Sequence, residues 1–243
     1  MCIVAIAHLA SRRYPLIVAA NRDERHARPS AAADWWDGPG SLLAGRDLAA
    51  GGTWLGATGT GRFAAVTNIF ESGAPAGAKS RGALVTGFLR GSEAPSEYAA
   101  ALAGASSLYG PFNLVLRSGE ALHFVSNRND SAALGAGVHV FSNNAPGLRW
   151  PKTGRLADAI ERAAGRDDLH ALLIETLSGS EARGPPEQAA ESLFVVGDSF
   201  GTRCTTVLTV DDEGRAVFVE ERFEPGGDPA GRSEFAFVLA IRP

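Results

Sequence analysis

The chain has 243 residues, of which 45% are hydrophobic and 21% are charged, values typical of a folded globular protein and unlike those of a disordered chain. The formal net charge is −4, and no run of Lys or Arg provides the basic surface that nucleic acids or anionic membranes require. We therefore expect a self-folding protein that does not bind nucleic acid.

The first half of the chain predicts two strand pairs followed by two helices. Two short apolar runs joined by a polar turn indicate an antiparallel hairpin, and glycines between the next two runs suit a second hairpin turn. Apolar residues then recur at helical spacing, with Ser96 as a candidate N-cap. The predicted strands are residues 2–9, 15–20, 52–56 and 62–68, and the predicted helices are 80–90 and 96–102.

The second half repeats this pattern and closes on strands. Asp167 and Asp168 open its second helix, where negative charge interacts favourably with the helix dipole. The predicted strands are residues 112–117, 121–126, 137–142, 203–210, 215–222 and 234–241, and the predicted helices are 152–164 and 167–177.

Alternating blocks of strands and helices favour two mostly antiparallel sheets with helix pairs outside them. The predicted fold is therefore of the α+β class, a four-layer αββα sandwich. No stretch has the composition of a linker, and no repeat has a solenoid period. We expect one domain over residues 1–243.

The N-terminus and the cysteines bear on location and cofactors. Residues 1–10 are apolar but lack a preceding basic segment, so we expect neither a signal peptide nor a membrane span. Cys2 and Cys204 lie far apart in sequence, which suits neither a disulfide framework nor a metal site, and the five histidines form no metal-like cluster. We expect a cytoplasmic protein without metal or other cofactor.

Cys2 is the first candidate for chemistry. Removal of Met1 would leave it with a free α-amine, so that one residue holds both a thiol nucleophile and a base for its proton. The alternative is a cysteine that only packs in a first strand as a small hydrophobic residue.

The polar run from Asn21 to Glu24 follows an apolar strand and is the second candidate. An antiparallel neighbour of the Cys2 strand would bring Asp23 beside the α-amine and Arg22 beside the sulfur, where they would lower the thiol pKa or orient the base. The alternative is a solvated turn with local ion pairs.

The chain resembles a known family through motifs that occur in a fixed order over nearly its whole length. The motifs are Met1-Cys2, Asn21 to Glu24, Gly45-Arg46-Asp47, Gly51-Gly52-Thr53-Trp54-Leu55-Gly56, Thr67-Asn68, Ser80-Arg81-Gly82, Phe112-Asn113-Leu114, Ser142-Asn143-Asn144, Trp150-Pro151-Lys152 and Gly201-Thr202-Arg203. With these motifs the chain is similar to the NRDE family, named for its Asn-Arg-Asp-Glu motif and also called the transport and Golgi organisation family.

That family is similar to the N-terminal-nucleophile (Ntn) hydrolases related to penicillin V acylase and conjugated bile salt hydrolase, which cleave linear amides with an N-terminal cysteine. The resemblance implies Cys2 as the nucleophile and Arg22 and Asp23 as the charged pair beside it. It also implies catalytic roles for Asn68 and Asn143, as polar stabilisers, and for Arg203, which corresponds to an arginine in a late strand of those enzymes. Candidate substrate contacts are Asn21, Glu24, Trp54 and Arg81.

These roles are physically reasonable and have alternatives. Asn68 could donate to an oxyanion, an interaction worth about 3–4 kcal/mol. Asn143 could hold the amine or a substrate carbonyl, Asn144 competes with it for that role, and either asparagine could simply cap a turn. Arg203 enters an apolar strand and should have a carboxylate or thiolate partner, whereas Cys204 should be a packed hydrophobic residue.

The leading functional hypothesis is a hydrolase acting on a small-molecule amide. The main alternative is a binding or trafficking protein on the same scaffold, with haem or an acyl lipid as its hydrophobic ligand, and a third is a protein whose site has lost activity. Gly51–Gly61 lacks the Gly-Lys-Ser/Thr of a phosphate loop, which argues against nucleotide binding. The sequence leaves the substrate and the oligomeric state open.

Overall fold

A computed structural model of the chain describes residues 2–38, 40–73, 77–143 and 150–240. The chain forms two compact units, each assembled from separate segments of the sequence. The first unit comprises Met1–Arg28, Ala136–Ser142 and Arg149–Val238, and the second comprises Pro29–Gly135, Asn143–Leu148 and Leu239–Pro243.

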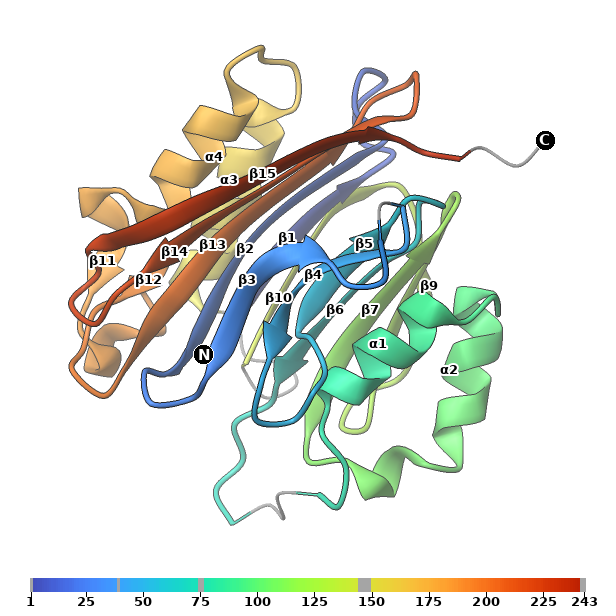
Figure 1. Ribbon diagram of the computed structural model, residues 1–243, viewed down its shortest axis with the longest axis horizontal. Helices are drawn as coiled ribbons and strands as arrows, with labels where there is room; N and C mark the ends of the chain where they lie inside the picture. Colours follow the sequence, from blue (N-terminus) through green and yellow to red (C-terminus); the bar gives the residue numbers. More distant parts are fainter. Residues whose placement is uncertain (1, 39, 74–76, 144–149, 241–243) are drawn as a thin grey trace. The chain divides into compact units, whose positions relative to one another are not determined.

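The first unit is built on a six-stranded antiparallel sheet (Figure 1). The apolar first strand lies near one edge and is paired on both sides, so the N-terminal segment is deeply buried. A short parallel pair, β11 (Arg183–Gly184) and β12 (Phe194–Val195), accompanies this sheet. In spatial order the strands of the large sheet are β10 (Gly137–Ser142), β1 (Ile3–His8), β2 (Leu16–Arg25), β13 (Phe200–Val210), β14 (Arg215–Phe223) and β15 (Pro229–Val238).

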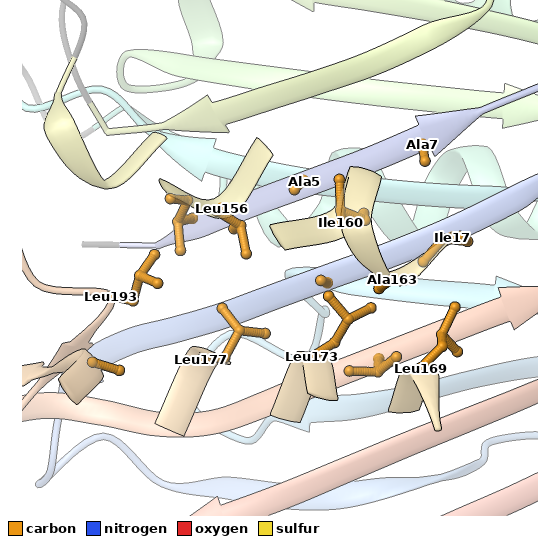
Figure 2. Packing of buried hydrophobic residues seen from close by; sticks show 14 of the residues in the cluster. Ala5, Ala7, Ile17, Leu156, Ile160, Ala163, Leu169, Leu173, Leu177 and Leu193 are labelled. Carbon is orange, nitrogen blue, oxygen red and sulfur yellow. The ribbon is translucent and has the colours of Figure 1, made fainter. Parts of the chain in front are cut away.

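Two helices, α3 (Pro151–Ala163) and α4 (Leu169–Ser178), cover one face of this sheet. Figure 2 shows their leucines and isoleucine directed at small residues of β1 and at Ile17 of β2. Each fully buried leucine contributes about 2 kcal/mol relative to an exposed one. The residues that make this contact are Leu156, Ile160 and Ala163 of α3, Leu169, Leu173 and Leu177 of α4, and Ala5, Ala7 and Ile17 of the sheet.

The second unit is a seven-stranded antiparallel sheet whose strands follow one another in chain order. Helices α1 (Gly82–Arg90) and α2 (Pro95–Ala103) pack through Leu84, Phe88 and Leu102 on its apolar core. The strands are β3 (Ser30–Trp35), β4 (Leu42–Asp47), β5 (Leu55–Thr58), β6 (Phe63–Asn68), β7 (Phe112–Ser118), β8 (Ala121–Ser126) and β9 (Ala132–Leu134).

Two motif glycines of the second unit serve backbone packing. A Cβ added at Gly52 would lie 2.7 Å from the carbonyl carbon of Gly82, and one added at Gly82 would lie 3.0 Å from the carbonyl oxygen of Thr53. The loop before β5 therefore touches the start of α1 backbone to backbone, which only glycine allows. This contact explains why both positions are glycine, so a bound phosphate is not needed to explain them.

The predicted α+β class with two large antiparallel sheets is confirmed, and several boundaries were wrong. The main error concerns β2, which was expected to end at residue 20 but continues to Arg25 because β13 pairs with it throughout. The half-exposed strands β3, β4 and β9 were not predicted. Strands β5, β13 and β15 span residues 55–58, 200–210 and 229–238, whereas the expected ranges were 52–56, 203–210 and 234–241.

The N-cap expected at Ser96 was also wrong. Helix α2 begins one residue earlier, because Pro95 presets the first helical φ and the Glu97 carboxylate accepts from the Ala94 N–H at 2.8 Å. Within the described residues, no helix is long and apolar enough to span a membrane.

Candidate active site

Cys2 lies immediately before β1 and is 9% exposed. Its thiol donates to the main-chain carbonyl of Asp23 on β2, with 3.8 Å between sulfur and oxygen. On the other side, Ser142 of β10 donates its hydroxyl to the Cys2 carbonyl at 3.3 Å. The two neighbouring strands thus hold Cys2 in place.

Asp23 is a buried carboxyl of the first unit, 5% exposed. Its Oδ1 accepts from the Thr202 hydroxyl at 2.6 Å, and the same hydroxyl oxygen accepts from the Val195 N–H at 2.8 Å. Burial raises the pKa of Asp23, whereas the charge of Lys152 and the Thr202 hydrogen bond lower it. Asp23 is therefore oriented by a residue of β13 that the sequence did not single out.

Lys152 was also missed as a site residue, although its motif was noted. It lies in the first turn of α3, is 0% exposed, and its Nζ has no hydrogen-bond partner within the described residues. The ammonium lies 5.2 Å from the centre of the Trp150 ring. Burial lowers the Lys152 pKa, and the charges of Asp23 and Cys2 raise it, so all three groups share one electrostatic environment.

A sequence signal for Lys152 exists in the helical period of α3. Lys152, Leu156, Ile160 and Ala163 follow one another at intervals of four, four and three, so the lysine occupies the first position of the buried apolar stripe. A lysine in such a stripe is a conflict between pattern and chemistry, which is where functional residues are expected.

The pKa of the Cys2 thiol is raised, and burial is the main cause. The Asp23 carboxylate raises it further, whereas Arg22 lowers it. Arg22 was expected to lower this pKa and does so, but burial and the Asp23 carboxylate outweigh it. The other expectation, that Asp23 orients the base, stays a prediction. Burial thus favours the neutral thiol over the thiolate at Cys2.

Asn21 has a structural role that the sequence did not predict. Its side chain is 0% exposed, and its amide nitrogen donates to the carbonyls of Leu177 at 2.8 Å and Leu193 at 2.9 Å. Its amide oxygen accepts from the Thr205 hydroxyl at 2.6 Å. The two donors thus fasten the end of α4 and the segment before β12 to the sheet, which leaves neither of them for a substrate contact.

Arg22 and Glu24 lie further along β2. Arg22 is 8% exposed, and its guanidinium is 4.0 Å from the Glu24 carboxylate, which is also 3.9 Å from Arg28. These separations are at the limit of ion pairing, so the pairs add little stability. In the register of β2 and β13, Arg22 is opposite Cys204.

Among the described residues, Arg203 does not have the carboxylate or thiolate partner expected for it. It sits at a register shift between Thr202 and Cys204, and its Nη1 donates to the carbonyls of Arg25, His26 and Arg28 at 3.1–3.2 Å. Three carbonyls at the end of β2 satisfy the guanidinium instead.

Cys204 is a packed thiol, 6% exposed, whose pKa burial raises well above its ordinary value. Cys2 and Cys204 are both free thiols. Because β2 lies between β1 and β13, the two cysteines are separated by two strand spacings, about 9.5 Å. A disulfide requires Cα atoms closer than about 7 Å, so this geometry does not permit one.

The remaining predicted residues belong to the second unit. Asn143 donates its amide to the Asn68 carbonyl, and its buried Oδ1 has no partner within the described residues, which leaves an acceptor available. Trp54 packs on the apolar core, and Arg81 donates to the Pro111 carbonyl at 3.1 Å. Asn144, the alternative to Asn143, lies outside the described residues.

The described part of the chain contains no group of three His, Cys, Asp or Glu side chains arranged to hold a metal ion. The chemistry available in the first unit is thus a thiol, a carboxyl and an ammonium. Such a set can move protons and stabilise charge around a nucleophilic sulfur.

Comparison with solved structures supports the fold. A Caenorhabditis elegans N-acylethanolamine-hydrolyzing acid amidase ortholog superposes with a TM-score of 0.50 over 85% of this chain and 92% of that chain, at 12% identity. At this identity the likeness concerns the fold alone, which is that of an Ntn hydrolase, as predicted.

Comparison with sequences gives a closer relation. Curated relatives include the Transport and Golgi organization protein 2 homologs of Bos taurus and Homo sapiens, each 32% identical to this chain. The alignments cover 94% of this chain and 95% of the bovine protein, and 90% and 92% for the human one. A family model described as Transport and Golgi organisation 2 matches residues 1–225. The chain belongs to the Transport and Golgi organisation 2 family.

Proposed function

We propose that this protein is an Ntn-type amidohydrolase that cleaves a linear C–N amide bond with Cys2. In the translated chain the Cys2 nitrogen is an amide, and removal of Met1 makes it an α-amine. The thiol proton passes to that amine as the sulfur bonds to the acyl carbon, and the protonated amine then gives the proton to the departing nitrogen. Water next cleaves the thioester, which releases the acid and restores the thiol.

The observation that carries this proposal is the setting of Cys2. Both cysteines are buried thiols near charged groups, Asp23 and Lys152 for Cys2 and Glu220 and Arg22 for Cys204, but only Cys2 can gain an α-amine beside its sulfur when Met1 is removed. Because burial keeps the resting sulfur protonated, an internal base is required, and the α-amine of a processed Cys2 has a suitable ordinary pKa of about 8.

The family resemblance extends the proposal to other residues. Asn68 would donate to the oxyanion, and Asn143, with its available Oδ1, would accept from an N–H group during the reaction. The relatives' names supply no substrate, so the acyl group and amine stay unspecified. One domain over residues 1–243 and a cytoplasmic location are part of the same proposal, the former supported by one family model over residues 1–225.

The test is direct observation of the acyl-enzyme. Protein whose loss of Met1 has been verified by intact mass is mixed with a panel of fluorogenic linear N-acyl amides, quenched in acid and mapped for acyl adducts. We expect a thioester on Cys2 and turnover that is lost in Cys2→Ala, while Cys204→Ala behaves as wild type. Retention of Met1, or adducts spread equally over both cysteines, would contradict the proposal.

A binding or trafficking role is the alternative, because the relatives carry names that refer to transport and Golgi organisation. A carrier of haem or an acyl lipid would keep its ligand affinity in Cys2→Ala. Equilibrium binding of haemin and of a fatty acyl probe to wild type and Cys2→Ala separates the two functions. Unchanged affinity together with absent turnover would favour the carrier.

A further inference from the structure

Lysine is rare in this protein, and one of its lysines is completely buried. Lys and Arg together number 23, and only Lys79 and Lys152 are lysine. Lys79 is exposed, as is usual for this residue type, whereas Lys152 is 0% exposed. A buried ammonium is costly unless it meets an opposite charge or a full set of acceptors.

The Lys152 ammonium lacks, within the described residues, the hydrogen-bond acceptors that would offset this cost. Within the described residues the Lys152 Nζ makes no hydrogen bond, and Trp150 offers it only a ring face. The groups that do act on it electrostatically are Asp23 and Cys2, the two residues at the centre of the proposed reaction. Lys152 also lies one helical turn before Leu156, on the face of α3 that packs on Ile3 at the start of β1, the strand that Cys2 precedes.

The charged groups around Cys2 come from two elements. Strand β2 contributes Arg22 and Asp23 and α3 contributes Lys152, while β13 adds the Cys204 thiol, whose pKa burial raises. The Asp23 carboxylate opposes a thiolate at Cys2, yet an ionised Asp23 is what would attract and orient a protonated α-amine. A cation close to both groups would reconcile these two effects of Asp23, because it would stabilise the carboxylate and the thiolate together.

We propose that Lys152 is a positioning residue of the Cys2 centre, whose buried ammonium keeps Asp23 ionised and offsets the repulsion between that carboxylate and the Cys2 sulfur. The inference rests on the proposed function. Lys152 keeps its proton throughout, while the thiol proton moves to the α-amine and then to the departing nitrogen. Lys152 thus acts through its charge on Asp23 and on the Cys2 sulfur, and it forms no bond to substrate.

The first test is a double-mutant cycle on the rate of Cys2 alkylation by iodoacetamide, measured from pH 5 to 10 in a Cys204→Ala background. Lys152→Met keeps the side-chain length and removes the charge. We expect it to move the midpoint of the profile upward and to slow alkylation at pH 7 about tenfold, the effect of one pKa unit. Lys79→Met, at the exposed lysine, is the matched control and should leave the profile unchanged.

The cycle is completed with Asp23→Asn and the double variant. Because Coulomb energies add, Asp23→Asn should lower the midpoint, Lys152→Met should raise it, and the double variant should react within about threefold of the Cys204→Ala parent. An unmoved profile in Lys152→Met would overturn the proposal. A double variant that reacts as slowly as Lys152→Met alone would also overturn it, because the Asp23 carboxylate would then not be the group whose repulsion Lys152 offsets.

A second measurement uses the native protein and does not depend on Cys2 reactivity. Lysine labelled with ¹³C at Cε gives two resonances, and Lys79→Arg identifies the one from Lys152. We expect the midpoint of the Lys152 titration to fall by about one pH unit or more in Asp23→Asn, because the carboxylate favours the ammonium. An equal midpoint in both proteins would overturn the inference. A clear shift in a protein that forms no acyl thioester would instead overturn only the proposed hydrolase.

Discussion

Asn21 and Lys152 are both completely buried polar residues of the first unit, and they differ in how their polar atoms are satisfied. The Asn21 amide uses both hydrogens and its oxygen in bonds to the main chain and to Thr205. The Lys152 ammonium makes no hydrogen bond within the described residues and interacts with its surroundings through charge.

This difference distinguishes a buried polar group with a structural role from one with a functional role. A fully satisfied buried amide stabilises one packing arrangement and has nothing left to offer a substrate. A buried charge without hydrogen bonds is maintained at a cost to stability, which is expected where a group serves chemistry. The four predictions below test whether this separation holds.

Asn21→Leu should give the largest loss of stability. It leaves two main-chain carbonyls and the Thr205 hydroxyl without partners, at about 1–3 kcal/mol each, so the free energy of unfolding should fall by roughly 4 kcal/mol. Urea denaturation measures this. Thr205→Val, which leaves both carbonyl bonds intact, should cost only about 1 kcal/mol. Equal losses would show that the carbonyl bonds contribute nothing.

Lys152→Met should make stability more sensitive to pH. The folded pKa of Asp23 is raised above its unfolded value, so its contribution is present at acid pH and is lost as pH rises through the folded pKa. Without Lys152 that pKa rises further, and the variant should be close to wild type near pH 4 but less stable by about 3 kcal/mol at pH 8.

The control for this prediction is Lys152→Met combined with Asp23→Asn, which removes both charges. Its unfolding free energy should vary less with pH than that of the single variant. A single variant that follows the wild-type pH dependence would show that the two charges are independent.

Thr202→Val should have an intermediate effect. It deletes the hydroxyl that donates to Asp23 and accepts from the Val195 N–H, so we expect a loss of about 2 kcal/mol and slower Cys2 alkylation. Thr206→Val, at a buried threonine on the same strand, is a matched control for the loss of a hydroxyl. Normal alkylation in Thr202→Val would remove Thr202 from the proposed centre.

Arg203→Met should have the smallest effect, about 1 kcal/mol, because its three carbonyl acceptors lie near solvent. We expect the pH profile of Cys2 alkylation to stay in place while the denaturation midpoint falls. A shifted profile would instead restore the catalytic role that the family resemblance implied for Arg203.

Much of the architecture could be predicted because the central strands and the helices carry clear periods. Strands β1 and β2 begin as apolar runs, and α3 has a regular apolar stripe. The edge strand β3 could not be found this way, since its Ala-rich sequence is only partly buried and shows no apolar alternation.

The candidate site was predictable in part. Cys2 and Asp23 stood out by position and chemistry, and the end of β2 was misplaced because its polar residues are buried by partners distant in sequence, such as Thr202 and Thr205. Such pairing leaves no local signal. Lys152 did leave a local signal, because a charged residue in the buried apolar stripe of a helix indicates a functional site.

The most direct test of the central claim is the ratio of alkylation rates at Cys2 and Cys204 in protein that has lost Met1. Both thiols are buried and both pKa values are raised by burial, so each serves as the reference for the other. The account predicts that Cys2 reacts at least about tenfold faster at pH 7, a difference of one pKa unit. Equal rates, or a faster Cys204, would contradict Cys2 as the nucleophile.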